Sequence, residues 1–403
     1  MVNKKNIIIY AIVFFIIFTI EFGLNSYLSF NLESSQYLFY QNIINILPLF
    51  TVFLGFGTPF AVVYMTSLSK SNNKVYLLES NLFALYFSLA IIAFFSILYT
   101  LEYLELYILI ALILGFFNAI KQNSVNFYLA KKELNKSSFI RLNQKLMYLI
   151  VIVISIYFLT INNNSMLSTI LIVGEIIGLL VLTYKYKIFI FKKFKKIKSI
   201  LKISKYAFLA NLFSMISLAT PIILLNYFNY PTNEIISFSI AYTLLRYSGI
   251  LLGPFMQLIT PYFTPIKNDL KKVKHLYIKY SFILFVIGIT VSIAMYFLAE
   301  YIISIFFSEA YSQAIELFKI LVFAVPIIIL SSFTSTLISS IVGVHYVSYI
   351  AIFGSFIIFT LVIIALMKFN IIFLVFAVIA HALYILLSGS YILNQKLRKT
   401  NAI

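Results

Sequence analysis

Long apolar runs alternate with short polar gaps along the whole chain. A helix needs about 20 residues to cross roughly 30 Å of hydrocarbon, and apolar windows of that length occur twelve times. They are predicted near residues 7–29, 36–66, 76–99, 103–130, 138–160, 166–184, 206–229, 234–264, 277–305, 313–341, 346–367 and 370–394. The first has no small-x-small cleavage site, so it is a helix and not a signal peptide. This pattern predicts an all-α membrane protein with 12 transmembrane helices.

Basic residues are unevenly distributed among the gaps. Of the 30 Lys and Arg residues, 25 lie at the two ends of the chain and in every second gap. Basic loops resist translocation across the membrane, whereas acidic residues have little effect on topology. The bias predicts a multi-pass protein of the bacterial cytoplasmic (inner) membrane with its N- and C-termini in the cytoplasm.

Composition excludes several other classes. With 62% hydrophobic and 10% charged residues, the chain cannot form a soluble core with a wettable surface. The net charge of +18 follows the topology, and few aromatic residues interleave with the bases, so no nucleic-acid partner is expected. The absence of Cys excludes disulfides, thiol nucleophiles and Cys-based metal sites.

The longest basic stretch, Lys185–Lys205, separates six predicted spans from another six. We therefore expect an N-terminal six-helix bundle at 1–187, a basic cytoplasmic linker at 188–204 and a C-terminal six-helix bundle at 205–403. Apolar residues recur at helical spacing between the lysines of the stretch: Ile190, Phe191, Phe194, Ile197 and Leu201. An interfacial helix on the anionic leaflet fits this spacing, and a plain topogenic linker is the alternative.

Five ionisable residues lie deep within predicted spans. They are Glu21, Lys121, Lys145, Glu175 and Arg246. A charge at the bilayer centre costs at least about 2.5 kcal/mol unless water or a partner receives it. Residues of this kind are candidates for function.

Arg246 belongs to a polar and small-residue stripe on one face of the eighth span. Its members are Ser239, Tyr242, Arg246, Gly249, Gly253 and Gln257. A guanidinium stays charged and can hold a phosphate through two parallel hydrogen bonds. Arg246 and Tyr242 are therefore candidates for binding an anionic headgroup, and a structural ion pair of Arg246 with Glu21 or Glu175 is the alternative.

The fourth and fifth spans resemble the walls of a cavity. Asn118 and Gln122 lie one turn apart with Lys121 beside them, and Arg141 and Lys145 share a face of the fifth span. These five residues are further candidates for substrate binding. Arg141 lies near the cytoplasmic end of its span, so snorkelling of its side chain is the alternative.

Glu21 and Glu175 are the carboxylates in the deep parts of the spans. A buried carboxylate can take up and release protons near neutral pH, so either residue is a candidate for coupling transport to a cation gradient. Glu175 also lies within the small-xxx-small pattern Gly174–Gly178, which is typical of close helix packing. Its charge would then simply pair with Lys145.

Three motifs carry a resemblance to a known family. They are the run Phe238–Arg246 leading to Pro254, Pro261 and Pro265, the run Phe307–Ile315 with its acidic-x-Tyr-x-x-Ala pattern, and the glycine-containing helix end Leu54–Gly57. With the six-plus-six layout, the chain resembles the polysaccharide transporter branch of the multidrug/oligosaccharidyl-lipid/polysaccharide (MOP) exporter superfamily. Within that branch it is similar to the O-antigen or capsular repeat-unit flippases.

The resemblance implies the MOP exporter fold and translocation of undecaprenyl-pyrophosphate-linked oligosaccharide by alternating access, with Arg246 as a contact for pyrophosphate. It implies coupling to H⁺ or Na⁺ without a cofactor. The partners it implies are membrane lipids, a polysaccharide polymerase and a chain-length regulator. A multidrug exporter is an alternative, although basic residues outnumber carboxylates in the deep parts of the spans. A polymerase or ligase is another alternative, but enzyme motifs and a large external loop are absent from the sequence, so we expect no enzyme.

Overall fold

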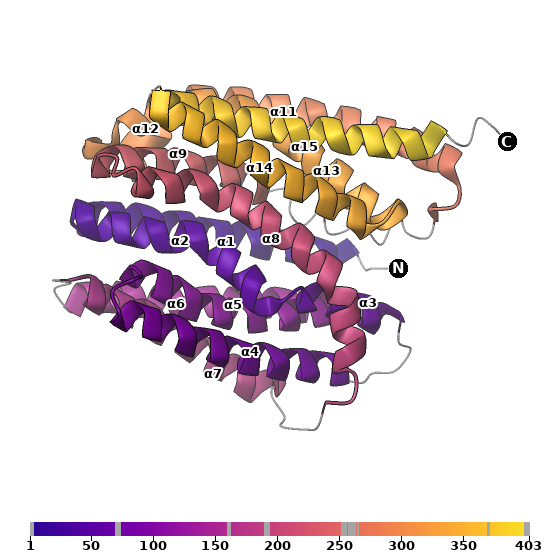
Figure 1. Cartoon of the computed structure of the whole chain (residues 1–403), viewed down its shortest axis with the longest axis horizontal. Helices are drawn as coiled ribbons and strands as arrows, with labels where there is room; N and C mark the ends of the chain where they lie inside the picture. The colour runs from indigo at the N-terminus through magenta and orange to yellow at the C-terminus, as the bar shows by residue number, and fades with distance from the viewer. Residues whose placement is uncertain are drawn as a thin grey trace. The chain divides into compact units, whose positions relative to one another are not determined.

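The computed structural model describes residues 4–68, 74–158, 163–188, 194–250, 256, 263, 266–368 and 371–398 (Figure 1). Within these ranges the regular structure is entirely helical, which confirms the predicted all-α class. By its internal contacts the chain divides into two compact units, Met1–Met215 and Ile216–Ile403.

The first unit is built around one central helix. Its helices are α1 (Lys4–Asn31), α2 (Ser34–Gly55), α3 (Thr58–Leu68), α4 (Val75–Thr100), α5 (Leu106–Ala130), α6 (Leu134–Phe158), α7 (Asn164–Tyr186) and the first part of α8 (Ile197–Tyr227). Helix α5 packs against α2, α3, α4, α6 and α7. Most of α5 is therefore covered by other helices, including its buried base Lys121.

The second unit is built around α13. Its elements after α8 are α9 (Thr232–Ile250), α11 (Leu270–Phe306), η2 (Glu309–Tyr311), α12 (Gln313–Leu321), η3 (Val322–Ala324), α13 (Val325–Ile341), α14 (Val344–Lys368) and α15 (Ile371–Arg398). Helix α13 packs against α9, α11, α14 and α15. A Cβ atom on Gly288 of α11 would lie 2.7 Å from the Cα of Pro326 on α13. Only a glycine fits this approach between the two helices.

Eleven helical segments of the described residues are long and apolar enough to cross a membrane. They match eleven of the twelve predicted spans. The exception is the eighth, near 234–264, of which the structure describes α9 up to Ile250 and two isolated residues beyond it. The protein is therefore a multi-pass membrane protein. The count of twelve spans and the side on which the termini lie stay predictions.

The predicted span near 36–66 consists of two helices, and the break lies at the helix end that the motif Leu54–Gly57 indicated. Helix α2 ends at Gly55, and Phe56 and Gly57 have φ values of 44° and 68° before α3 begins. A Cβ atom on Gly57 would collide with the carbonyl oxygen of Ser204 in α8, so the backbone here must both turn and pass close to another helix. Hydropathy did not reveal this break because the residues around it are apolar.

The basic linker leads directly into a long helix. Residues 197–205 form the start of α8, which continues through the predicted seventh span to Tyr227. Phe194 comes before the helix and packs edge-on against Tyr86 of α4, whereas Ile190 and Phe191 lie outside the described residues. The placement of 188–204 on a membrane surface stays a prediction.

Residues at the start of α4 form hydrogen bonds with the end of α7 and with both described ends of the linker. The ammonium of Lys74 donates to the carbonyl of Tyr186 at 3.2 Å, and the Asn81 amide donates to the carbonyl of Ile188 at 2.9 Å. The carboxylate of Glu79, 4% exposed, accepts hydrogen bonds from the backbone N–H groups of residues 195 and 196 at 2.9 and 2.7 Å. Backbone N–H groups at the start of a helix lack partners within it, and a carboxylate is a strong acceptor for them.

Candidate functional site

The deep ionisable residues of the first unit come together in one cluster. Glu21 lies on α1, Lys121 on α5, Lys145 on α6 and Glu175 on α7, and all four interact electrostatically. The ammonium of Lys145 lies 2.8 Å from the Glu21 carboxylate, and the two side chains are 23% and 27% exposed. Arg246 lies in the second unit, and the predicted alternative of its ion pair with Glu21 or Glu175 stays a prediction.

Lys121 is the most buried base of this cluster. Its side chain lies on the central helix α5 and is 6% exposed. Among the described residues no carboxylate comes within ion-pair distance of its ammonium, although Glu21 and Glu175 act on it from farther away. A buried cation without a close counter-ion is costly. Such an ammonium is suited to receive an anionic ligand.

Glu175 is buried, 3% exposed, and its field acts on both Lys121 and Lys145. Its neighbour Gly174 lies against α6, because a Cβ atom there would be 3.2 Å from the ring of Tyr148 and 3.3 Å from its Cα. The prediction of close helix packing at Gly174–Gly178 is confirmed at Gly174. The ion pair of Lys145 is with Glu21, and the field of Glu175 acts on Lys145 as well, so pairing of Glu175 with Lys145 stays a prediction.

Arg141 is held by aromatic rings on α1. Its guanidinium carbon lies 4.7 Å from the ring centre of Phe14 and 5.8 Å from that of Tyr10. A guanidinium over an aromatic face is stabilised by the negative charge density of the ring. The interaction joins α6 to α1 on the Lys145 side of the cluster, and the charge of Arg141 reaches Lys121. The cluster therefore contains three bases and two acids.

The amides predicted beside Lys121 differ in their surroundings. Asn118 is buried and its amide donates to the carbonyl of Leu114 in its own helix at 3.3 Å, whereas Gln122 is half-buried. The buried amide Asn123 meets Thr58, whose hydroxyl lies 3.0 Å from Asn123 Oδ1 and so ties α3 to α5. Asn118 and Gln122 stay candidates for substrate binding.

Sequence reasoning missed a polar contact between α1 and α2. The carbonyl oxygen of the Asn25 side chain accepts from the Tyr37 hydroxyl at 3.0 Å and from the Gln41 amide at 2.6 Å. All three side chains are buried. The only signal in the sequence was an amide one turn beyond Glu21, which carries no information about its partners.

Arg246 and Tyr242 lie on α9 in the second unit. Tyr242 is buried and stacks on Phe238 with ring centres 5.5 Å apart, and the half-buried Arg246 follows one turn later, where its charge acts on Tyr242. Ser239 is buried on the same stripe. Gly253 and Gln257 of the predicted stripe lie outside the described residues, and so do the surroundings of Gly249.

Metal coordination has no support in the described part of the chain. No group of three or more His, Asp or Glu side chains is assembled there as metal ligands, and the sequence contains no Cys. The cluster has more bases than acids, so it is suited to binding an anion. Its acids and bases can also pair with one another.

Comparison with known proteins identifies both a family and a fold. The profile of the family described as "Polysaccharide biosynthesis protein" matches residues 32–316. The fold is similar to that of a multidrug resistance MATE family transporter of the MOP superfamily in an outward-facing conformation, with a TM-score of 0.72 and 16% identity over 98% of this chain and 97% of that one. No curated protein sequence matches.

A second solved structure also has a similar fold. It is a MOP superfamily transporter from Pyrococcus furiosus, described as having a binding pocket of reverse polarity that suggests a different function. Its TM-score is 0.74 at 15% identity, over 98% of this chain and 96% of that one. At such identities the likeness concerns the fold alone, and it confirms the predicted MOP exporter fold.

Proposed function

The chain belongs to the family of polysaccharide biosynthesis proteins, and from this premise we propose that it is a flippase for lipid-linked oligosaccharide repeat units. The substrate is an undecaprenyl-pyrophosphate-linked glycan of O-antigen or capsule type, moved across the bacterial cytoplasmic membrane by alternating access. The observation that carries the proposal is Lys121, a buried ammonium on the central helix without an ion pair among the described residues.

Lys121 supplies the attraction for the headgroup. A pyrophosphate that leaves water loses its hydration, and a buried ammonium replaces that hydration through charge-assisted hydrogen bonds. The low dielectric of the site strengthens the attraction. Asn118 and Gln122, on the same helix, offer amides to sugar hydroxyls, and Arg246 with Tyr242 is the proposed headgroup contact of the second unit.

The ion pair between Glu21 and Lys145 supplies the coupling. In the structure Glu21 neutralises Lys145. Protonation of Glu21, or its occupation by Na⁺, releases the Lys145 ammonium and raises the net charge of the cluster by one. The charge of the cluster, and with it the attraction for the headgroup, therefore depends on whether Glu21 holds a cation. Glu175 is the second candidate for this role, because its field acts on the same two lysines.

A multidrug exporter is the second candidate function, favoured by the likeness of the fold to MATE transporters. Exporters of cationic drugs require an acidic site, whereas three bases oppose two acids in this cluster. The sign of the charge therefore favours an anionic substrate. Increased resistance to cationic drugs on expression of the protein, with no effect on glycan export, would decide for the multidrug exporter.

The test uses a strain that lacks the gene and measures lipid-linked repeat units on the two leaflets. We expect these units to accumulate on the cytoplasmic leaflet and the wild-type protein to move them outward. Lys121→Gln should fail to rescue, Lys121→Arg should rescue in part, and the exposed-surface control Lys202→Gln on α8 should rescue fully. Full rescue by Lys121→Gln at wild-type abundance would refute the role of Lys121, and outward movement in the empty strain would refute the flippase.

A further inference from the structure

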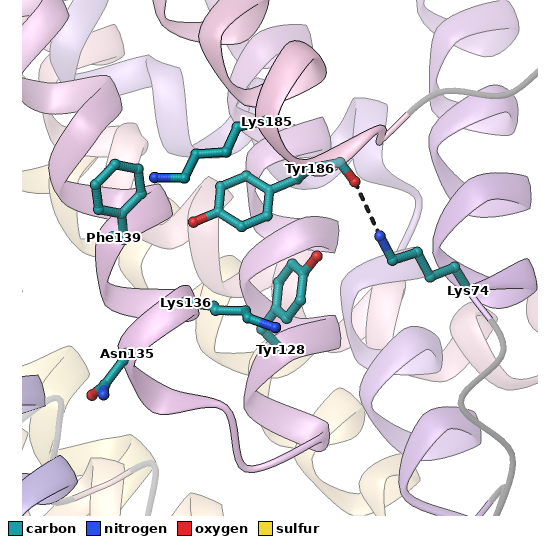
Figure 2. A pocket seen from close by; sticks show the side chains of 7 residues that line it. All are labelled: Lys74, Tyr128, Asn135, Lys136, Phe139, Lys185 and Tyr186. Carbon is teal, nitrogen blue, oxygen red and sulfur yellow. Dashed lines mark hydrogen bonds between the residues drawn. The ribbon is translucent and has the colours of Figure 1, made fainter.

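A second basic site lies at one end of the first unit, apart from the candidate functional site around Lys121. It is an open cavity of about 480 Å³ where α4 and α6 begin and α5 and α7 end (Figure 2). Its walls include the lysines Lys74, Lys136 and Lys185 and the rings of Tyr128, Phe139 and Tyr186. Ligand pockets in proteins measure about 300–1,000 Å³, so this cavity is large enough for a small anionic group.

The three lysines come from different parts of the fold. Lys74 precedes α4, Lys136 lies in the first turn of α6 and Lys185 lies in the last turn of α7. Figure 2 shows the ammonium groups of Lys74 and Lys185 on either side of Tyr186, with Lys136 beside Tyr128. Packing of the helices therefore gathers charges that would repel one another in the absence of a counter-ion.

Aromatic rings hold Lys136 and Lys185 in place. The ammonium of Lys185 lies 3.5 Å from the ring centre of Phe139, and that of Lys136 lies 5.6 Å from the ring centre of Tyr128. The rings of Tyr128 and Tyr186 are 5.5 Å apart between centres. Rings of this kind orient an ammonium and exclude part of its water. The hydroxyl groups of Tyr128 and Tyr186 add two donors that an anion can use.

Positive charge exceeds negative charge around the cavity. Burial, together with the nearby charges of Lys131 and Lys136, lowers the pKa of Lys74 from its usual value. Glu133 lies 2.6 Å from Lys136 and offsets part of the excess. The remaining repulsion between lysines is relieved when an anion enters.

We propose that this cavity binds a phosphate group, presented either by the headgroup of an anionic lipid or by a free phosphate compound. Three ammonium groups and two tyrosine hydroxyls around one open space match the oxygens of a phosphate. The charge bias of the sequence places these lysines on the cytoplasmic side, where the membrane surface is anionic. The site is separate from Lys121, and its occupation does not require the proposed transport activity.

The experiment measures binding of two probes to the purified full-length protein in detergent by ³¹P NMR titration. Sodium pyrophosphate represents free phosphate, and short-chain phosphatidylglycerol represents a lipid headgroup. Diacylglycerol of the same chain length competes with the lipid probe to reveal binding through the acyl chains alone. The variants are K136Q/K185Q and Lys74→Gln, and the charge-matched control K271Q/K274Q removes two exposed lysines of α11.

We expect K136Q/K185Q to weaken binding about tenfold, as the loss of charge-assisted contacts implies, and the control to stay within about twofold of wild type. Binding of either probe that K136Q/K185Q weakens supports the site and identifies its source of phosphate. Lys74→Gln also removes the hydrogen bond to Tyr186, so if that variant fails to fold the double variant decides. Binding of neither probe, equal binding by K136Q/K185Q and wild type, or displacement of the lipid probe by diacylglycerol would overturn the proposal.

Discussion

The two units use their polar groups in different ways. In the first unit, α1, α5, α6 and α7 bring charged residues together within the membrane-spanning part, including the pair Glu21–Lys145. In the second unit, the described contacts that join its helices include uncharged hydrogen bonds, such as that from Ser292 to the carbonyl of Val322 at 2.7 Å. Close packing at Gly288 joins α11 to α13.

This difference separates charge that serves binding from contacts that serve packing. A buried base without a close counter-ion lowers stability, so it is retained where it contributes something other than stability. A neutral hydrogen bond or a glycine contact costs little and holds helices together. Substitution of Lys121 should therefore affect transport and stability in opposite directions, whereas substitution of a packing residue such as Gly288 should reduce stability alone.

The strongest test of this contrast is Lys121→Met. The substitution keeps an unbranched side chain, one heavy atom shorter, and removes the charge, so we expect transport to fall about 100-fold through loss of the charged contact. Stability should rise by about 1–3 kcal/mol because a desolvated charge is removed. Heat-induced loss of the monodisperse protein in detergent measures the second effect, with Lys121→Arg as the control. A lower melting temperature would show that Lys121 is a structural residue.

Gly288→Ala tests the packing of the second unit. Its new methyl group would lie 2.7 Å from the Cα of Pro326, so α11 and α13 must separate. We expect a loss of about 2 kcal/mol of stability from overpacking, with no change in the affinity for substrate. The same thermal assay measures it. Gly23→Ala on α1 is the matched control, since no atom lies within 4 Å of the new methyl group.

Glu21→Gln tests the ion pair of the first unit. The ammonium of Lys145 loses its counter-ion, and we expect a loss of about 1–2 kcal/mol of stability. Lys145→Met in the same chain should restore most of it, because no unpaired charge is left at that position. A double variant as unstable as Glu21→Gln alone would contradict this account. Transport by Glu21→Gln that no longer depends on the cation gradient would identify Glu21 as the coupling group.

Ser292→Ala should have the smallest effect. It removes the hydrogen bond to Val322, and bonds of this kind between helices in membranes contribute about 0.6 kcal/mol on average. A shift in melting temperature near the limit of detection is expected. A loss as large as that for Gly288→Ala would show that polar contacts matter more in the second unit than its packing does.

Much of the fold could be predicted from hydropathy because a bilayer imposes the length of each apolar helix. Hydropathy did not predict the local backbone geometry within or between these helices. The turn at Phe56 and Gly57 lies within an apolar run, and α8 joins the linker to the seventh span in one helix. Neither feature changes the average hydropathy of its segment.

The candidate site could be predicted in its members but not in its pairs. Deep charges are rare in membrane spans, so Glu21, Lys121, Lys145 and Glu175 could be found one by one. Their partners depend on how each helix is rotated about its axis, and that rotation is decided by packing. Glu79 was missed for the same reason, because its partners are backbone N–H groups more than a hundred residues away.

The sequence by itself determined that the chain is a helical protein of the membrane, because lipid tolerates only long apolar helices and few charges. It also determined which deep residues carry charge. Only the tertiary structure decided that Glu21 neutralises Lys145, that Lys121 lies on the central helix, and that Lys74, Lys136 and Lys185 surround one cavity. Hydropathy describes each helix alone, whereas these contacts arise from several helices packed side by side.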